Sequence, residues 1–212
     1  MGEADFLIYL SELLAASGRQ VAVVDHSPEK DIFALLPFQE EEDIVTYHGV
    51  EYQRGLWKEE SVQMYRTFDI VFLVVGTENI GIVSEYPAEV WYIFLTANRK
   101  GIERTKQIAW EREVPMFLFI RDFCEYKITA SYIRSLWREE RGKIDGWYEI
   151  PFDTIDYEYA VRMQYEPVNE YKQLSKEMQE VLLTVASKLT GLTKKEEAVI
   201  YKKIKRGKKK CR

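Results

Sequence analysis

Residues 20–28 read Gln20-Val-Ala-Val-Val-Asp25-His-Ser-Pro28, and this stretch decides the fold. Its four consecutive apolar residues lie between polar residues, and a proline follows shortly afterwards. A short continuous apolar run indicates a strand that is buried on both faces, as in a parallel sheet, rather than an edge strand with alternating polarity. We therefore expect Val21 to Val24 to form an internal parallel strand.

Similar patterns extend in both directions from this strand. Before it, Ala4 to Ser17 has apolar residues at helical spacing, and Gly18 is a suitable helix stop. After it we expect one helical turn at Asp31 to Leu36 and a short strand near Ile44, Val45 and Tyr47. Further strands are expected at Asp69 to Val75, Glu89 to Leu95, Val114 to Ile120 and Tyr148 to Pro151, and helices at Asn98 to Glu111, Ile128 to Glu140 and Tyr171 to Leu189.

Strands that alternate with helices imply crossover connections, which predict an α/β fold with a mainly parallel sheet and helices on both faces. We expect one domain over residues 1–192 and a basic C-terminal tail over residues 193–212. An antiparallel meander of the main strands would contradict this fold.

The composition and charge of the chain indicate its cellular compartment and the kind of partner that it could bind. The 212 residues are 46% hydrophobic and carry a net charge of −5, but residues 194–212 hold ten Lys/Arg against two Glu, a net charge of +8. The rest carries 20 basic and 33 acidic residues, or −13. No apolar run is long enough to span a membrane, and the first residues do not resemble a signal peptide. With two distant cysteines and no metal-ligand spacing, we expect a reduced, cytoplasmic setting.

Several segments, in order, resemble the ParA/MinD group of P-loop ATPases. They are Gly2-Glu-Ala-Asp-Phe6 with the helix that follows, Ala15-Ala-Ser-Gly18, and Val21-Ala-Val-Val-Asp25-His-Ser-Pro28, then Phe68 to Val75 as the Walker-B strand, Met116 to Arg121, and Glu149-Ile-Pro151-Phe-Asp. The resemblance covers about residues 2–191 and implies a P-loop NTPase-like fold. It marks Gly2, Glu3, Ala4, Asp5, Asp25 and Pro151 as remnants of a nucleotide site.

The departures from the family pattern bear on activity. The resemblance puts Glu3 at the phosphate-binding Lys, Ala4 at the Mg²⁺-binding hydroxyl and Val74 at the Walker-B carboxylate. Carboxylates beside a triphosphate repel it, most strongly where water is partly excluded. We therefore expect a pseudo-ATPase that does not hydrolyse ATP. We expect it to have no catalytic residue and to bind neither a nucleotide cofactor nor a metal.

The family's first strand and glycine loop come before the position of Gly2. We expect an upstream segment to hold them, because removal of a central strand would leave its two neighbours with unpaired backbone groups. Whether these parts are missing from this chain stays open.

Other polar residues are interpreted as structural. We expect Cys124 to be a small buried filler, and Trp91, Tyr92 and Phe94 to pack in the core. Neither His26 nor His48 has a carboxylate or Cys partner at metal-ligand spacing. Four acidic residues near strand ends are treated as ordinary loop carboxylates: Asp122, Glu125, Asp153 and Asp156.

The leading hypothesis is a non-hydrolysing ParA/MinD-like scaffold or regulator that acts through protein partners, with a homodimer as one option and a location at the membrane as another. The alternative is a nucleotide-binding ATPase of this type with a truncated start. A third is a nucleic-acid binder that uses the tail, which the acidic body disfavours.

The tail itself predicts an electrostatic anchor for an anionic membrane surface. Its basic residues are Lys202, Lys203, Lys205, Arg206, Lys208, Lys209 and Lys210, with Arg212 at the end. It also has the option of folding back on acidic loops such as Glu40 to Asp43.

Deletion of residues 202–212 should leave the thermal midpoint almost unchanged, because a solvated charged segment buries little apolar area. It should reduce co-sedimentation with anionic liposomes, and that binding should fall steeply as salt screens the charges. Equal sedimentation of both forms would remove the membrane interpretation, and the same salt-sensitive binding to DNA instead would favour the nucleic-acid alternative.

Overall fold

The computed structural model has the α/β composition that the sequence predicts, with strands interspersed among helices along the chain. The structure describes residues 3–28, 30–37, 42–55, 66–76, 88–107, 114–124, 126–137, 144–166, 171–191 and 196. Gly2, Glu125, residues 38–41 and all of the tail except Glu196 lie outside the described residues. No helix in the described ranges is long and apolar enough to cross a membrane.

The first sheet holds four strands in the order β2-β3-β1-β4. Its centre is β1 (Val21–Asp25), fully buried as expected and parallel to both β3 (Val50–Gln53) and β4 (Ile70–Val74). At the edge, β2 (Ile44–Tyr47) pairs with β3 in antiparallel fashion. The sequence interpretation placed one strand here and missed the hairpin. Its two turn residues, His48 and Gly49, have φ values of 47° and 82°, which suits the primed turns that join tight hairpins.

The second sheet holds three parallel strands, β5 (Trp91–Thr96), β6 (Met116–Phe123) and β7 (Gly146–Pro151). The expectation of a single mainly parallel sheet therefore needs correction: the described strands form two sheets, and one edge strand is antiparallel. Among the described strands, β4 pairs only with β1, and β5 pairs only with β6.

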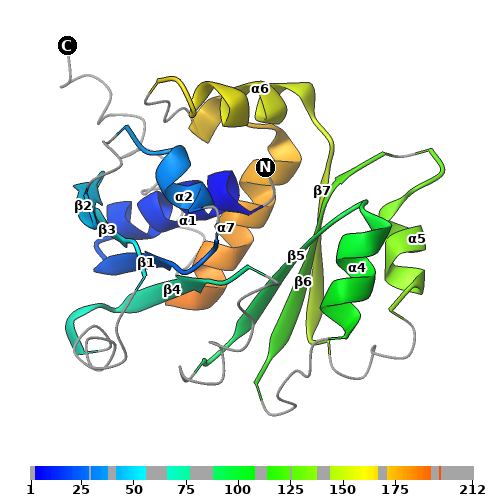
Figure 1. Cartoon of the computed structure of the whole chain (residues 1–212), viewed down its shortest axis with the longest axis horizontal. Helices are drawn as coiled ribbons and strands as arrows, with labels where there is room; N and C mark the ends of the chain where they lie inside the picture. Colours follow the sequence, from blue (N-terminus) through cyan, green and yellow to red (C-terminus); the bar gives the residue numbers. More distant parts are fainter. Residues whose placement is uncertain are drawn as a thin grey trace.

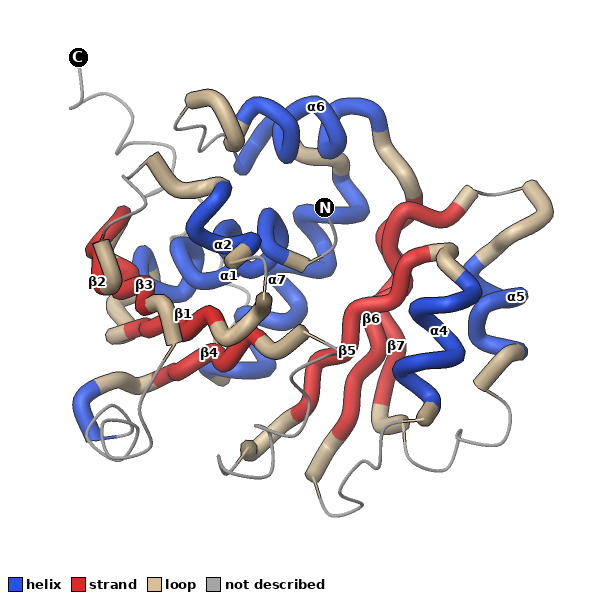
Figure 2. The backbone as a smooth tube through the Cα atoms, viewed as in Figure 1, coloured by secondary structure: helices blue, strands red, loops and turns tan. Residues whose placement is uncertain are grey.

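One layer of two helices packs against both sheets (Figures 1 and 2). The first is α1 (Ala4–Ala16), in which every residue from Ala4 to Leu14 is buried. Its Phe6 ring lies 5.4 Å from Phe94 in β5 and 5.2 Å from Phe119 in β6. The second is α7 (Lys176–Thr190), which begins at the Ser175 cap and ends at Gly191 in the left-handed conformation. This shared layer holds the two sheets in one core.

The other face of the second sheet is covered by α4 (Arg99–Lys106) and α5 (Ala130–Ser135) (Figure 1). Side chains of Asn98 and Thr129 cap the two helices. Ile102, Ile133 and Trp137 pack with residues of β5 and β6 in a separate apolar cluster. Helices on both faces are thus confirmed for this sheet.

Three further elements complete the described chain. A short α2 (Asp31–Ala34) follows β1, as expected. The helix α6 (Thr154–Arg162), which the sequence interpretation treated as loop, follows β7, and a 3₁₀ turn η3 (Tyr171–Gln173) precedes α7. Cys124 is exposed rather than buried, because it follows the end of β6.

A buried carboxylate lies on α1 beside the β2–β3 hairpin. Glu12 is 7% exposed, and its Oε1 lies 3.1 Å from Nδ1 of His48. Burial raises the pKa of Glu12 above its usual value, and the contact with His48 opposes that rise. The folded chain therefore holds this proton in a pH range where the unfolded chain has already released it, and stability should fall as pH rises through that range.

Replacement Glu12→Gln removes this titration while it keeps a donor toward His48. We expect the variant to match the parent near pH 4 and to gain stability of the order of 1 kcal/mol toward pH 8. Urea unfolding across this pH range measures the difference, with Glu158→Gln, an exposed position, as the control. A Glu12→Gln effect that does not change with pH would contradict the assignment.

Candidate functional site

The N-terminus of α1 lies at the carboxyl ends of strands from both sheets. On the side of the first sheet, Asp31, which begins α2 after β1, lies close enough for its charge to raise the pKa of Glu3 at the start of α1. From the second sheet, Arg121 in β6 reaches Asp5 in the first turn of α1. In open α/β sheets, ligand sites form at the carboxyl ends of strands, so this is the candidate site.

A buried, bidentate ion pair occupies the centre of this site. Nη1 of Arg121 donates to Oδ1 of Asp5 at 2.7 Å, and Nη2 donates to Oδ2 at 3.0 Å. The two residues are 4% and 2% exposed. Burial alone would lower the pKa of Arg121, but the charge and hydrogen bonds of Asp5 raise it, so the guanidinium stays charged. Paired forks of this kind are among the stronger charged contacts in proteins.

A local irregularity in β6 accompanies this arginine. The ladder with β7 shifts between Arg121 and Phe123, which is a bulge, and Asp122 has a φ of 56°. Bulges often re-aim side chains near sites, and a non-glycine residue in the left-handed region stores backbone strain. Asp122 is half-buried, and burial raises the pKa of its carboxyl group, with the charge of Arg121 acting in the opposite direction.

Acidic residues dominate the rest of the site. Glu3 precedes α1, and burial followed by the charge of Asp31 raises the pKa of its carboxyl group. Ala4, the first helical residue, is buried and offers no hydroxyl. Val74 is a buried apolar residue at the end of β4. Within the described residues no group of His, Cys, Asp or Glu has the arrangement of a metal site.

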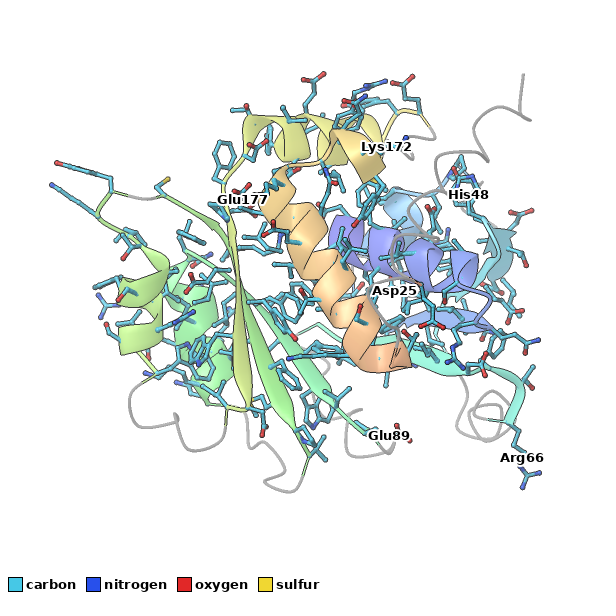
Figure 3. All side chains as sticks on the ribbon, turned by 180° about the vertical axis from the view of Figure 1, so that it is seen from behind. Asp25, His48, Arg66, Glu89, Lys172 and Glu177 are labelled. Atoms are coloured by element: carbon cyan, nitrogen blue, oxygen red, sulfur yellow. The ribbon has the colours of Figure 1, made fainter. Side chains whose placement is uncertain are left out.

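Asp25 is completely buried and serves local structure (Figure 3). Its Oδ1 accepts from the backbone N–H of Ser27 at 2.8 Å and from the Ser27 hydroxyl, and its Oδ2 accepts from the N–H of Ile32 at 3.1 Å. These donors tie the end of β1 to the start of α2. Asp25 thus orders the β1–α2 turn, where Lys30 also donates from Nζ to the Asp25 carbonyl at 2.7 Å.

The structure brings some of the expected site residues together and separates others. Glu3, Ala4 and Asp5 lie together at the start of α1, close enough to α2 for the charge of Asp31 to act on Glu3. Pro151 ends β7 and pairs with Phe123, at the carboxyl end of the second sheet. Gly2 and the basic residues of the tail lie outside the described residues.

Arg121 is the site residue that the sequence interpretation missed. Two signals in the sequence could have identified it: a lone arginine after the apolar run Met116 to Ile120, and a lone Asp5 inside an apolar helix. Buried charges require partners, and each is the partner of the other. Asp156, treated as a loop carboxylate, is likewise buried, and it accepts from the N–H and hydroxyl of Ser175, at 2.6 Å each.

Comparison with known proteins shows a similar fold among solved structures but no matching family. No protein-family model matches the chain, and no curated protein matches its sequence. Among solved structures it is similar to a nucleotide-binding protein from Archaeoglobus fulgidus in complex with ADP, with a TM-score of 0.50 and 14% sequence identity. The match covers 76% of this chain and 82% of the other. The chain therefore has an α/β fold similar to that of a nucleotide-binding protein.

Replacement Arg121→Met should leave the Asp5 carboxylate buried without its partner. We expect the free energy of unfolding to fall by about 3–5 kcal/mol, whereas the double replacement Asp5→Leu with Arg121→Met should recover much of that loss. Urea unfolding of the single, double and parent proteins measures both effects. The exposed pair Arg162–Glu166 supplies the control, and Arg162→Met should leave the midpoint nearly unchanged. If Arg121→Met and Arg162→Met lowered the free energy of unfolding equally, the assigned role of the Asp5–Arg121 pair would be contradicted.

Proposed function

We propose that this protein is a non-hydrolysing ParA/MinD-like scaffold or regulator that works through protein partners. The observation that carries the proposal is the Asp5–Arg121 ion pair at the N-terminus of α1. In P-loop proteins this helix end binds phosphate through free backbone N–H groups and the helix dipole. Here the carboxylate of Asp5 already lies in the first turn of this helix. It also neutralises the charge of Arg121, so that this guanidinium offers no free positive charge to a phosphate.

The surrounding residues support the same proposal. Glu3 and Asp122 add two partly buried carboxyl groups, and Ala4 and Val74 supply no ligand for Mg²⁺. A triphosphate would meet net negative charge in a site of reduced dielectric, where repulsion is stronger than in water. Asp25 is engaged with Ser27 and Ile32, so it is not free to orient an attacking water.

The alternative function is nucleotide binding without efficient hydrolysis. It is favoured by the likeness to a solved protein that holds ADP. Under this alternative, the Asp5–Arg121 pair would open when the nucleotide binds, and Arg121 would exchange the Asp5 carboxylate for a phosphate.

Calorimetric titration of the purified chain with MgATP and with MgADP separates the two functions. We expect no saturable heat up to about 1 mM of either nucleotide, which corresponds to less than about 4 kcal/mol of binding free energy. A micromolar dissociation constant would favour the alternative. Turnover of MgATP that disappears on Asp25→Ala would contradict the proposal altogether.

A further inference from the structure

The first turn of α4 carries charges of the sign that a helix disfavours at that end. The N-terminus of a helix has a partial positive charge, so acidic residues stabilise the first turn and basic residues do not. In α4 the first two residues are Arg99 and Lys100, both exposed, and the first turn holds no acidic residue. The side chain of Asn98 caps this turn by accepting from the backbone N–H groups of Lys100 and Gly101, at 3.0 and 3.3 Å. Helix stability therefore gives no reason for the two cations.

The whole of α4 is basic, although the protein around it is acidic. Its sequence, Arg-Lys-Gly-Ile-Glu-Arg-Thr-Lys, has four basic residues and one acidic residue, a net charge of +3. Residues 1–193 together carry 20 basic and 33 acidic residues, a net charge of −13. The acidic residue of α4, Glu103, pairs with Lys106 in the last turn, with 3.7 Å between Oε2 and Nζ. The first turn of α4 is thus a local concentration of positive charge.

The segment between β6 and α5 exposes large hydrophobic side chains. Tyr126 is 82% exposed, Ile128 is 41% exposed, and Tyr132, in the first turn of α5, is 47% exposed. Lys127 is also exposed, and its Nζ lies over the Tyr126 ring, 5.4 Å from the centroid. Exposed hydrophobic residues that lie together, with polar residues around them, are typical of contact surfaces.

The basic turn and the hydrophobic segment lie at the same edge of the second sheet. The strands β5 and β6 are parallel neighbours, and their last paired residues in this ladder are Thr96 and Arg121. The helix α4 follows β5, and α5 follows β6, so both helices begin at the carboxyl edge of the sheet and cover the same face (Figure 1). We call the exposed residues at this edge the carboxyl-edge surface: Arg99, Lys100, Tyr126, Lys127, Ile128 and Tyr132.

The composition of the carboxyl-edge surface indicates the chemistry of its partner. Lys and Arg attract anionic lipid headgroups, and tyrosine and aliphatic side chains suit the boundary between headgroups and acyl chains. A nucleic acid fits less well, because stacking needs open aromatic faces. One face of the Tyr126 ring carries Lys127, and Ile128 has no ring. The acidic residues elsewhere do not prevent the contact, since salt screens exposed charges beyond about 8 Å.

We propose that the carboxyl-edge surface binds the anionic surface of a lipid membrane. Arg99, Lys100 and Lys127 contact the headgroups, and the two tyrosines and Ile128 enter the headgroup boundary. This contact is separate from the one expected of the basic tail, and it does not depend on whether the site at α1 binds nucleotide.

Co-sedimentation of the full chain with vesicles of equal parts phosphatidylcholine and phosphatidylserine tests the contact. We expect the double replacement Arg99→Glu with Lys100→Glu to weaken binding at least about tenfold at low salt. The matched control is Arg19→Glu with Arg66→Glu, which changes the net charge equally. These two exposed residues precede β1 and β4, at the amino edge of the first sheet, and Figure 3 labels Arg66. The control should bind nearly as the parent does.

A second double replacement, Tyr126→Ser with Ile128→Ser, separates the apolar contribution from the electrostatic one. We expect it to weaken binding at low and at physiological salt alike, because salt does not screen an apolar contact. The effect of the Arg99 and Lys100 replacements should instead shrink as salt rises. Circular dichroism establishes that each variant is folded.

Three outcomes would overturn the proposal. The first is a parent chain that does not bind these vesicles at low salt. The second is equal vesicle binding by the parent, the Arg99 and Lys100 variant and the control variant, which would assign the contact to another part of the chain, such as the tail. The third is binding of a DNA duplex that the Arg99 and Lys100 replacements abolish while vesicle binding persists, which would identify a nucleic-acid surface instead.

Discussion

The burial of α1 between two separate sheets is the constraint on which the rest of the structure depends. A helix with all its residues from Ala4 to Leu14 buried cannot place its polar groups freely, because each needs a partner inside the protein. Asp5 meets Arg121 of the second sheet, and the hydroxyl of Ser11 lies 3.2 Å from that of Tyr52 in the first. Together with the contacts of Phe6 to Phe94 and Phe119, these pairs fix α1 to both sheets at once.

The Asp5–Arg121 ion pair therefore affects both the stability of the fold and the charge of the candidate site. The Asp5–Arg121 pair joins the first turn of α1 to β6, and it also places an internal carboxylate where a helix N-terminus would otherwise attract an anion. The bulge at Arg121 and the strained φ of Asp122 occur next to this pair. Because the pair is buried, opening the site to a phosphate would require breaking contacts that hold the two sheets together. Binding of an anion at this helix end would therefore compete with folding stability.

The parts of the fold that could be predicted from sequence are those with a strong local signal. The continuous apolar runs gave β1, β4 and β6, and helical spacing with a following glycine gave α1 and α7. Pairing between strands is non-local, so the division into two sheets and the antiparallel β2 could not be derived from residue patterns. The helix α6 was missed because Asp153 and Asp156 suggest a loop until their roles as cap and as partner of Ser175 are known. Arg121 was missed for the opposite reason, since a charge at a strand end usually faces solvent.

The inward-facing Asp156 of α6 and the buried pair at α1 share a physical origin. In both places a carboxylate is turned inward because a specific donor requires it, Ser175 for Asp156 and Arg121 for Asp5. At α1 the other residues of the helix are apolar enough for Ala4 to Leu14 to remain buried on all sides. At α6, Asp156 and Ala160 are buried, Tyr159 and the following Met163 pack against the main core, and Ile155 and Tyr157 remain at the surface. Core packing therefore accounts for which residues of α6 point inward, and it tolerates a carboxylate among them because both oxygens of Asp156 accept hydrogen bonds from Ser175.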